Sequence, residues 1–405
     1  MSAPWSLPDN LARFRKARNL SQEQLAASAG VAVDTIARIE RYERKTTRPS
    51  TVNKLATALG VSPGVLLGIM QAHGADAANV AALRQAITAS EEIPGLVDFA
   101  EPAELLPLTT LTQSAHSAWR AYVDGRHAEL LHALPTLLID ARRLAHDAED
   151  DDLQAAAHRV LSTTYRLGAG LAGRFGLDDL AWTSAERALR AARVSDSPDL
   201  ETAISVRYLV WTLVRQGRTE DAERVAVRAA EQIEPRMLDR DPRRAGVFGN
   251  LLFNAASAAS RSGQIERAND LLAVAQSAAV RAGTDHASEA AIFGPRVAVL
   301  QAIDLAVLSG DPEKALHLAE HVPDAQGEVP AFWEAGHRLM LAAAAAALRD
   351  NQRALEYLSE ARDLAPDWVR YQPLGTSTMR TLVDRATRRR GESFAALAAH
   401  YGVVG

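Results

Sequence analysis

The sequence contains no cysteine. This absence excludes disulfide bonds, zinc sites with cysteine ligands and catalysis by a thiol, and it is typical of proteins in a reducing cytosol. Aromatic residues make up only 5% of the chain, whereas alanine and leucine are abundant. Because alanine and leucine favour helices and aromatic residues favour strands, the composition predicts an all-α protein.

Long apolar stretches are also absent. The longest, Leu339–Leu348, is about half as long as a membrane-spanning helix needs to be. The start of the chain, MSAPWSLPDN, lacks the basic residues and apolar core of a signal peptide. We therefore expect a cytoplasmic protein with no membrane partner. Its 405 residues are enough for two or more domains.

The net charge of −5 alone argues against a nucleic-acid partner, but the charge is unevenly distributed. Residues 1–70 contain ten lysines and arginines against five acids, a balance of +5. The remainder of the chain therefore carries −10. A basic head on an acidic body indicates that the N-terminal part meets a polyanion and the rest does not.

The first seventy residues carry the signals of five short helices. Ser21 and Gln24 form a capping box that begins the second helix. Gly30 supplies the left-handed backbone at which that helix stops. The other predicted boundaries are the end of the first helix near residue 18, the end of the third near Arg41, and the starts of the fourth and fifth at Ser50 and Ser62. This pattern predicts a helix-turn-helix unit.

Two segments carry a resemblance, LSQEQLAASAGVAVDTIARIE and RPSTVNKLATALGVSPGVLLG. They are similar to the lambda-repressor-like, xenobiotic-response-element-type DNA-binding domain. The resemblance covers about 60 residues, so we assign residues 1–70 to this domain. It implies that the third helix enters the major groove and that Gln22 touches a backbone phosphate. A five-helix interaction module that has lost DNA binding is the alternative.

In that family the base-facing positions fall here on Ala32, Val33, Asp34, Ala37 and Arg38. Arg38 is able to pair with guanine through two hydrogen bonds, and Val33 and the methyl group of Thr35 suit a thymine methyl. Asp34 either accepts from a cytosine amine or places a favourable charge in the first turn of its helix. Direct readout is therefore sparse, and half-site spacing and DNA shape are expected to contribute to specificity.

The chain departs from the family pattern after the third helix. Tyr42 stands where the family usually has glycine, and the loop over residues 43–49 is a few residues long. Its Arg44, Lys45 and Arg48 are natural phosphate ligands, or alternatively a solvated basic loop. Residues 71–106 follow as a connector, with one helix predicted over Ala77–Ala89 and a proline-rich stretch after it.

From residue 107 onward, strand signals are essentially absent and one pattern recurs: a turn residue, an alanine five positions later and a small residue seven further on. The turn residues are Gly176, Gly217, Gly263, Gly310 and Arg349, spaced by 39 to 47 residues, with Gly125 as a degraded earlier copy. Small residues let paired helices approach closely. The segments SGQIERANDLLAVAQSAA and QGRTEDAERVAVRAAEQ resemble tetratricopeptide repeats with lengthened helices, which implies an α-solenoid. A generic helical bundle is the alternative.

The predicted organisation is therefore a helix-turn-helix domain (1–70), a connector (71–106), a tetratricopeptide-like repeat domain that senses a ligand (107–366), and C-terminal capping helices (367–405). A solenoid presents a concave face formed by the first helix of each pair. Asn250 and Asn254 share a helical face there and suit an extended peptide backbone, and Arg207 and Trp211 share another. The complete set of candidate ligand contacts is Arg166, Arg207, Trp211, Asn250, Asn254, Arg296, Trp333 and His337.

No enzyme is predicted. The segment Gly168-Ala-Gly170-Leu-Ala-Gly173 matches GxGxxG but follows a helical stretch, so it indicates close helix packing or a break. We find no HExxH, P-loop or GxSxG motif, and the histidines show no ligand spacing. No catalytic residue, cofactor or metal site is therefore expected.

A helix-turn-helix head on a repeat body resembles bacterial regulators whose repeats bind short signalling peptides in quorum sensing, and the Ala- and Arg-rich composition suits an actinobacterium. The resemblance implies a homodimer that binds an operator, as an inverted repeat of double-stranded DNA. Its signal is a peptide, a small molecule or a protein partner. A repeat-based scaffold with a vestigial head is the alternative function.

Overall fold

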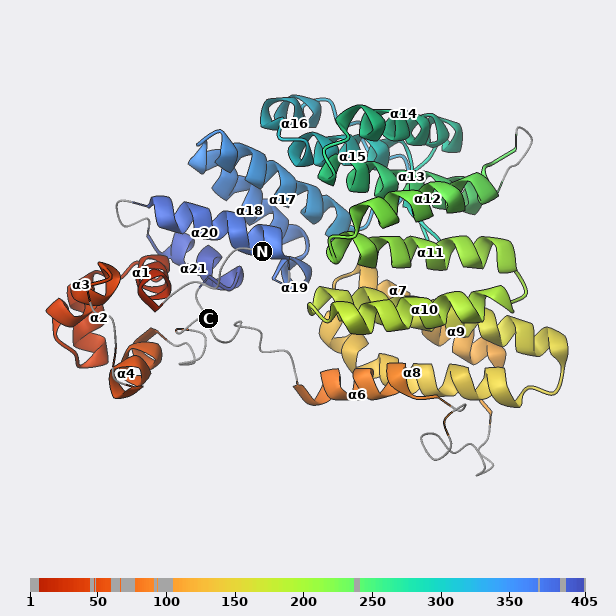
Figure 1. Cartoon of the computed structure of the whole chain (residues 1–405), viewed down its shortest axis with the longest axis horizontal. Helices are drawn as coiled ribbons and strands as arrows, with labels where there is room; N and C mark the ends of the chain where they lie inside the picture. The colour runs from red at the N-terminus through yellow and green to blue at the C-terminus, as the bar shows by residue number, and fades with distance from the viewer. Residues whose placement is uncertain are drawn as a thin grey trace. The chain divides into compact units, whose positions relative to one another are not determined.

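The computed structural model describes residues 7–43, 47, 49–59, 66, 77–90, 93, 105–236, 241–370, 372–386 and 391–403 (Figure 1). The chain divides into two compact units. The first unit combines residues 1–74 with residues 338–405, and the second comprises residues 75–337. Almost all described secondary structure is helical, as the composition predicts. The domain boundaries predicted at residues 70, 106 and 366 stay a prediction.

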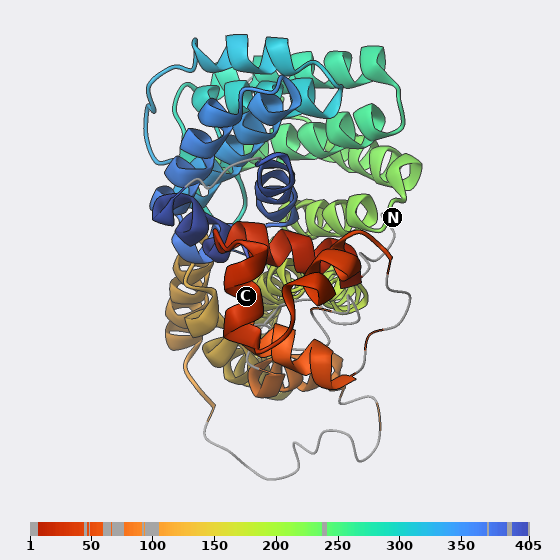
Figure 2. The same ribbon diagram turned by 90° about the vertical axis from the view of Figure 1, so that its left-hand side faces the viewer.

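The N-terminal part of the first unit contains four described helices, drawn in red in Figure 2: α1 (Leu7–Ala17), α2 (Gln22–Ala29), α3 (Val33–Glu40) and α4 (Pro49–Leu59). The predicted capping box is present, because the Ser21 hydroxyl accepts from the Gln24 nitrogen and the Gln24 side chain accepts from the Ser21 nitrogen. Gly30 adopts the left-handed conformation that ends α2. Helix α4 begins at Pro49, so Ser50, the predicted cap, lies inside its first turn, and most of the predicted fifth helix lies outside the described residues.

The core of this head is apolar and fully buried. It is formed mainly by Leu11, Phe14, Leu25, Ile36, Ile39, Leu55, Leu59 and Leu66. Because these residues recur at helical spacing, each of the helices α1 to α4 contributes one apolar face to this core. The faces turned toward the core are therefore set by the sequence pattern.

The C-terminal part of the first unit contains the end of α17 (Ala331–Ala347), followed by α18 (Asn351–Leu364), α19 (Pro366–Val369), α20 (Pro373–Arg385) and α21 (Glu392–His400). Tyr401 is fully buried, donates its hydroxyl to the Leu358 carbonyl at 2.7 Å, and packs against Gly375. Helix α1 packs on α20 and α21. There the buried Arg13 guanidinium lies 3.1 Å from the Asp384 carboxylate.

The second unit is a stack of paired helices (Figure 1). Its helices are α6 (Ala77–Thr88), α7 (Leu108–Val123), α8 (His127–Asp147), α9 (Asp151–Arg174), α10 (Asp178–Arg193), α11 (Pro198–Arg215), α12 (Thr219–Ile233), α13 (Pro242–Arg261), α14 (Ile265–Ala282), α15 (Pro295–Leu308), α16 (Pro312–Ala319) and the start of α17. Helices α7, α9, α11, α13 and α15 each pack on the next of the series, and α8, α10, α12 and α14 pack between them on the other layer. We call the layer formed by α7, α9, α11, α13 and α15 the inner layer, because successive helices of this layer contact one another directly.

The recurring turn and alanine positions explain this stack. Gly125, Gly176, Gly217, Gly263 and Gly310 have φ between 73° and 78°, and Arg349 has φ 63°. The alanines five positions after the last five of these turn residues are fully buried: Ala181, Ala222, Ala268, Ala315 and Ala354. The predicted helical repeat is thus confirmed. In the weak copy at Gly310, α16 ends at Ala319, so the predicted small residue Val322 lies outside the helix.

The GxGxxG segment lies inside the unbroken helix α9 and serves close packing. A Cβ atom on Gly170 would lie 2.8 Å from the Tyr122 hydroxyl of α7. A Cβ atom on Gly173 would lie 2.3 Å from the Trp211 ring of α11. The glycines therefore let α9 approach both inner neighbours, and no phosphate loop is present at this point.

A short hairpin interrupts the helices, contrary to the expectation that strands are essentially absent. Strands β1 (His286–Ala287) and β2 (Ile292–Phe293) pair antiparallel between α14 and α15. The buried Asp285 carboxylate accepts from the backbone nitrogens of Arg296, Val297 and Gln326. Two-residue strands held by a capping carboxylate show no alternating pattern, so sequence periodicity cannot reveal them. Within the described part of the chain, every helix is too short or too polar to span a bilayer.

Candidate nucleic-acid interface and ligand cavity

Helix α3 keeps one face in the core and the other in solvent. Ile36 and Ile39 are fully buried, while Thr35 and Ala37 are half-buried. The exposed positions are Ala32, Val33, Asp34 and Arg38, and the Asp34 and Arg38 side chains are 72% and 57% exposed. The residues predicted to face bases are therefore accessible within their unit. A groove-reading role requires this accessibility.

Glu40, the last residue of α3, fixes the three helices of the motif to one another. Its carboxylate accepts two hydrogen bonds from Arg15 of α1, at 2.7 and 2.9 Å, and one from the Gln22 amide of α2, at 2.7 Å. Paired bonds between guanidinium and carboxylate are directional as well as strong. These hydrogen bonds among Arg15, Gln22 and Glu40 fix the orientation of α3, and they were not predicted from the sequence. In this structure Gln22, predicted to touch phosphate, is held by Glu40.

Arg38 and Asp34 form an ion pair one helical turn apart, at 3.6 Å. Both side chains are largely exposed, so the pair contributes at most about 0.5 kcal/mol. Arg38 can therefore release Asp34 at little cost. Asp34 lies in the first turn of α3 and is exposed, as both a first-turn charge and a base contact require.

Tyr42, at the position where the resemblance leads one to expect glycine, has φ 60°, a left-handed conformation that glycine adopts more easily. Its hydroxyl donates to the Asp9 carboxylate at the start of α1. Tyr42 thus reproduces the backbone of the expected glycine and adds a contact to α1. Three of the predicted phosphate ligands, Arg44, Lys45 and Arg48, lie outside the described residues.

The second unit contains a cavity of about 710 Å³ on its inner layer. Its walls are α7, α9, α11, the first turn of α13 and the turn between β1 and β2. Apolar side chains alternate with charged ones, and the charged or titratable residues are His116, Arg159, Arg166, Glu201, Arg243 and Glu289. Ligand pockets have about this volume and this mixture of an apolar surface with a few polar groups.

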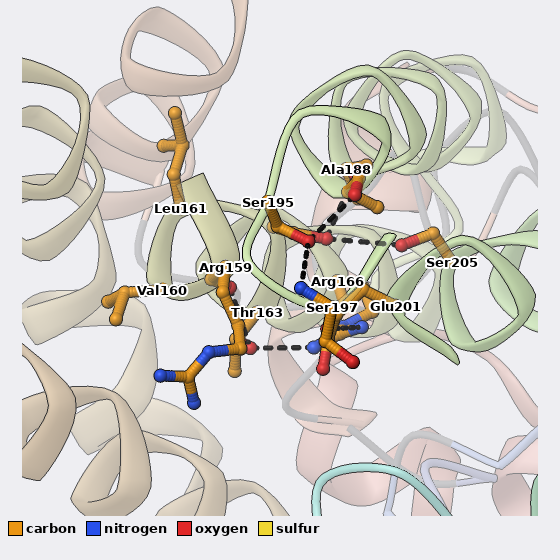
Figure 3. Close-up of polar contacts among 12 residues, drawn as sticks. Arg159, Val160, Leu161, Thr163, Arg166, Ala188, Ser195, Ser197, Glu201 and Ser205 are labelled. Atoms are coloured by element: carbon orange, nitrogen blue, oxygen red, sulfur yellow. Dashed lines mark hydrogen bonds and ion pairs between the residues drawn. The ribbon is translucent and has the colours of Figure 1, made fainter. Parts of the chain in front are cut away.

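A buried ion pair forms part of the cavity wall (Figure 3). The Arg166 guanidinium donates to Glu201 at 2.7 Å and to the Thr163 hydroxyl at 2.6 Å. The Arg166 and Glu201 side chains are only 3% and 9% exposed. Behind them, Ser162 donates to the Ala188 carbonyl at 2.9 Å and lies 3.1 Å from Ser205. These bonds fix α9 against α10 and α11, so the polar groups of the wall are held in place.

The other basic residues of the cavity wall are more exposed, and each lies beside an acid. Arg159 pairs with Asp196 at 2.8 Å, and His116 lies 2.5 Å from Glu289. A side-chain hydrogen bond to Asp241 raises the pKa of Arg243. The wall thus offers donors and acceptors side by side with little net charge.

The structure brings one of the eight sequence-predicted ligand residues to the cavity wall and places the others elsewhere. Arg166 lines the cavity, and the other seven do not. Asn250 is buried and donates to the carbonyls of Gly246 and Ile292, which ties α13 to β2. Arg296 pairs with Glu334 at 2.6 Å, and buried His337 lies 2.7 Å from Asp304.

The other four are packed beside aromatic rings or half-buried. The Arg207 guanidinium lies over the Tyr208 ring and Trp211 lies under Arg215. Trp333 stacks beside His337, and Asn254 is half-buried. Arg159 and Thr163 were not predicted, although they share a face of α9 with Arg166: Thr163 lies three residues before Arg166, and Arg159 lies four before Thr163. That spacing was the available signal.

Residues 11–66 match the helix-turn-helix family model. The matched span contains the capping box, the Gly30 turn and the exposed face of α3. The N-terminal residues form a helix-turn-helix domain of the DNA-binding kind. The fold predicted for this part is confirmed, and it supports a transcriptional regulator.

No curated protein matches this sequence. Among solved structures, the chain is similar to Bacillus thuringiensis PlcR, solved in complex with the peptide PapR7 and DNA. The sequence identity is 11% and the TM-score is 0.36, over 78% of this chain and 95% of that chain. The function proposed below therefore rests on the residues of this chain.

Proposed function

We propose that the chain is a transcriptional regulator that binds an operator through α3 and responds to a peptide or small-molecule ligand bound by its helical-repeat unit. The observation that carries this proposal is the open face of α3 on a core locked by Glu40. The proposal gives the chain no catalytic activity. It places the protein in the cytoplasm, where its operator is found.

DNA recognition follows from the exposed residues of α3. Arg38 donates to the O6 and N7 atoms of guanine, and Val33 and Thr35 contact a thymine methyl group. Because one short helix reads few bases, two heads of a homodimer bind an inverted repeat with half-sites about 34 Å apart. The repeat unit supplies the dimer contacts.

Ligand recognition follows from the cavity wall. The alternating cations and acids suit a ligand that offers both donors and acceptors, as a peptide backbone does. The buried Arg166–Glu201 pair gives the wall fixed polar groups, and the apolar residues between them exclude water. Bound ligand would alter the packing of the inner helices and thereby the spacing of the two heads. Native mass spectrometry of the purified protein identifies any molecule that remains in the cavity.

Gel-shift assays with DNA from upstream of its own gene test the DNA-binding role. Wild-type protein should bind in a salt-dependent manner, because phosphate contacts release counterions. Arg38→Ala should lose roughly 1–3 kcal/mol of binding free energy and relax sequence preference. Arg193→Ala, an exposed arginine on α10, is the matched control and should bind as wild type does.

The same assay separates the remaining alternatives. If Asp34 contacts a base, Asp34→Ala relaxes the sequence preference. If Asp34 only places a charge in the first turn, Asp34→Ala binds more tightly without a change of preference, because repulsion from phosphate is removed. Wild-type protein that shows no salt-dependent DNA binding contradicts the proposal and favours a repeat-based scaffold with a vestigial head.

A further inference from the structure

Three potential metal ligands gather at the end of α16 in the second unit. They are His317, Glu320 and His321, and their ligand atoms all lie within 4.8 Å of one another. The two imidazole rings have centroids 4.8 Å apart, and Nδ1 of His317 lies 4.0 Å from a Glu320 carboxylate oxygen. In the part of the chain that the structure describes, no other group of three such side chains is this close. No metal site was expected from the sequence, although Glu320 and His321 follow His317 at the helical spacings of three and four residues.

The hydrogen bonding of His321 favours metal binding. Its Nδ1 lies 3.0 Å from the His317 carbonyl oxygen, so the proton of the neutral ring belongs on Nδ1. Nε2 then keeps its lone pair for a metal ion. Metal-binding histidines commonly donate their second ring nitrogen in this way, because the bond fixes both the tautomer and the ring orientation.

The position at a helix end also favours a cation. His317 lies in the last turn of α16, and Glu320 caps its C-terminus. The carbonyl groups of a helix C-terminus carry partial negative charge, which attracts a cation. Glu313, one turn before His317 on the same helix, adds a carboxylate, and Lys314 opposes it with one positive charge.

We propose that His317, Glu320 and His321 bind a divalent transition-metal ion, of which Zn²⁺ is the representative. Two imidazoles and one carboxylate are a ligand set that zinc accepts, with water at the remaining position. Zinc–ligand bonds of about 2.0–2.2 Å require the three ligand atoms to approach further. All three residues are exposed, so no packing opposes rotation of the His317 and Glu320 side chains toward His321.

The bound ion would join α16 to the turn that follows it. That turn leads to Gln326, whose backbone nitrogen donates to the buried Asp285 carboxylate. Zinc would therefore stabilise the link between α16 and the hairpin region. The site is separate from the cavity, since none of its three ligands lines the cavity.

Isothermal titration of the full-length, chelator-stripped protein with Zn²⁺ at pH 7.5 tests the proposal. Wild type should bind one Zn²⁺ per chain. His317→Ala and His321→Ala should each weaken binding at least about tenfold, and the double variant should abolish it. Protons compete for imidazole nitrogens, so binding should also weaken at pH 5.5. His132→Ala, an exposed histidine on α8, is the matched control and should bind as wild type does.

Circular dichroism of each variant shows whether the fold is intact, and surface substitutions should leave the helical signal unchanged. Absence of stoichiometric Zn²⁺ binding by the wild type would overturn the proposal. Binding that survives in the double variant would overturn it equally, because the ion would then lie elsewhere. DNA binding by the head is measured separately, so neither result bears on the proposed regulatory function.

Discussion

At the scale of single residues, the turn position of each repeat imposes one conformation on unlike residues. Five glycines and Arg349 all have left-handed backbones, with φ between 63° and 78°. At Gly217 a Cβ atom would meet no other atom within 4 Å, so the cost of a side chain there is conformational alone. For a residue other than glycine, this conformation costs about 1–2 kcal/mol. The repeat ending at Arg349 therefore carries a strain that the others avoid.

Arg349→Gly should therefore raise the free energy of unfolding by about 1 kcal/mol. Glycine removes the backbone strain of the folded state, but its greater entropy in the unfolded chain offsets part of that gain. Gly217→Ala, the converse change in the second unit, should lower it by a similar amount. Urea denaturation followed by circular dichroism measures both. A destabilising Arg349→Gly would show that the arginine side chain contributes more than its backbone costs.

At the scale of elements, polar contacts fix the helix-turn-helix motif. The apolar core explains why α1, α2 and α3 associate, but it permits some rotation of α3 about its axis. The bonds from Arg15 and Gln22 to Glu40 remove that freedom, since a guanidinium and a carboxylate meet in a fixed plane. The orientation of α3 thus depends on Glu40, which lies outside the set of exposed positions on that helix.

Glu40→Ala should destabilise the head by about 2–3 kcal/mol, because Arg15 is left in a largely buried position without its carboxylate. It should also weaken binding to the proposed operator, because α3 loses the bonds that fix its orientation. Thermal unfolding and gel shifts measure the two effects. Glu43→Ala is the matched control, because its ion pair with Arg41 is exposed and contributes little. Equal stability of the two variants would contradict this account.

At the scale of the whole second unit, a buried cluster joins its first helices to its last. The Arg174 guanidinium lies 4.7 Å from the centre of the Tyr122 ring and 5.4 Å from that of Phe332. His127 stands edge-on to Tyr122 at 6.0 Å. Outside the cluster, Arg120 of α7 pairs with Glu328, just before α17, at 2.5 Å. The stack is therefore closed by contacts between residues about two hundred positions apart.

The buried cluster makes the unit sensitive to acid. Burial, together with the nearby Arg174 charge, lowers the pKa of His127 from 6.5 to about 3. In the unfolded chain, His127 is protonated below about pH 6.5. In the folded chain, it stays neutral until the pH falls to about 3. This contribution to stability is therefore complete above pH 6.5 and is lost as the pH falls, by up to about 1.4 kcal/mol per pH unit.

His127→Leu should flatten the decline of the free energy of unfolding between pH 6.5 and pH 4.5. Urea denaturation at several pH values measures the slope, which is independent of any constant loss from altered packing. His132→Leu, on the exposed face of the same helix, should keep the wild-type slope. Identical slopes for wild type and His127→Leu would show that another group governs acid unfolding.

Local signals in the sequence predicted much of this architecture. Ser21, Gln24 and Gly30 set the ends of α2, and the recurring glycine and alanine positions located the helical pairs. Contacts between distant segments were beyond reach, because helical spacing shows which residues share a face but not which helix lies opposite. The pairing of Arg166 with Glu201 and the packing of α1 on α20 belong to this class. Asn250 and Asn254 share a face as expected, yet the bond from Asn250 to Ile292 depends on a hairpin that the pattern did not reveal.

The contact between Arg13 and Asp384 links residues 371 positions apart. A ribosome adding about 5–20 residues per second needs roughly 20 to 75 seconds to cover that distance. The N-terminal part of the first unit is synthesised first, whereas residues 338–405, which complete that unit, are added only at the end of synthesis. A product released early by a premature stop would still carry α3, but it would lack the Asp384 carboxylate that anchors α1.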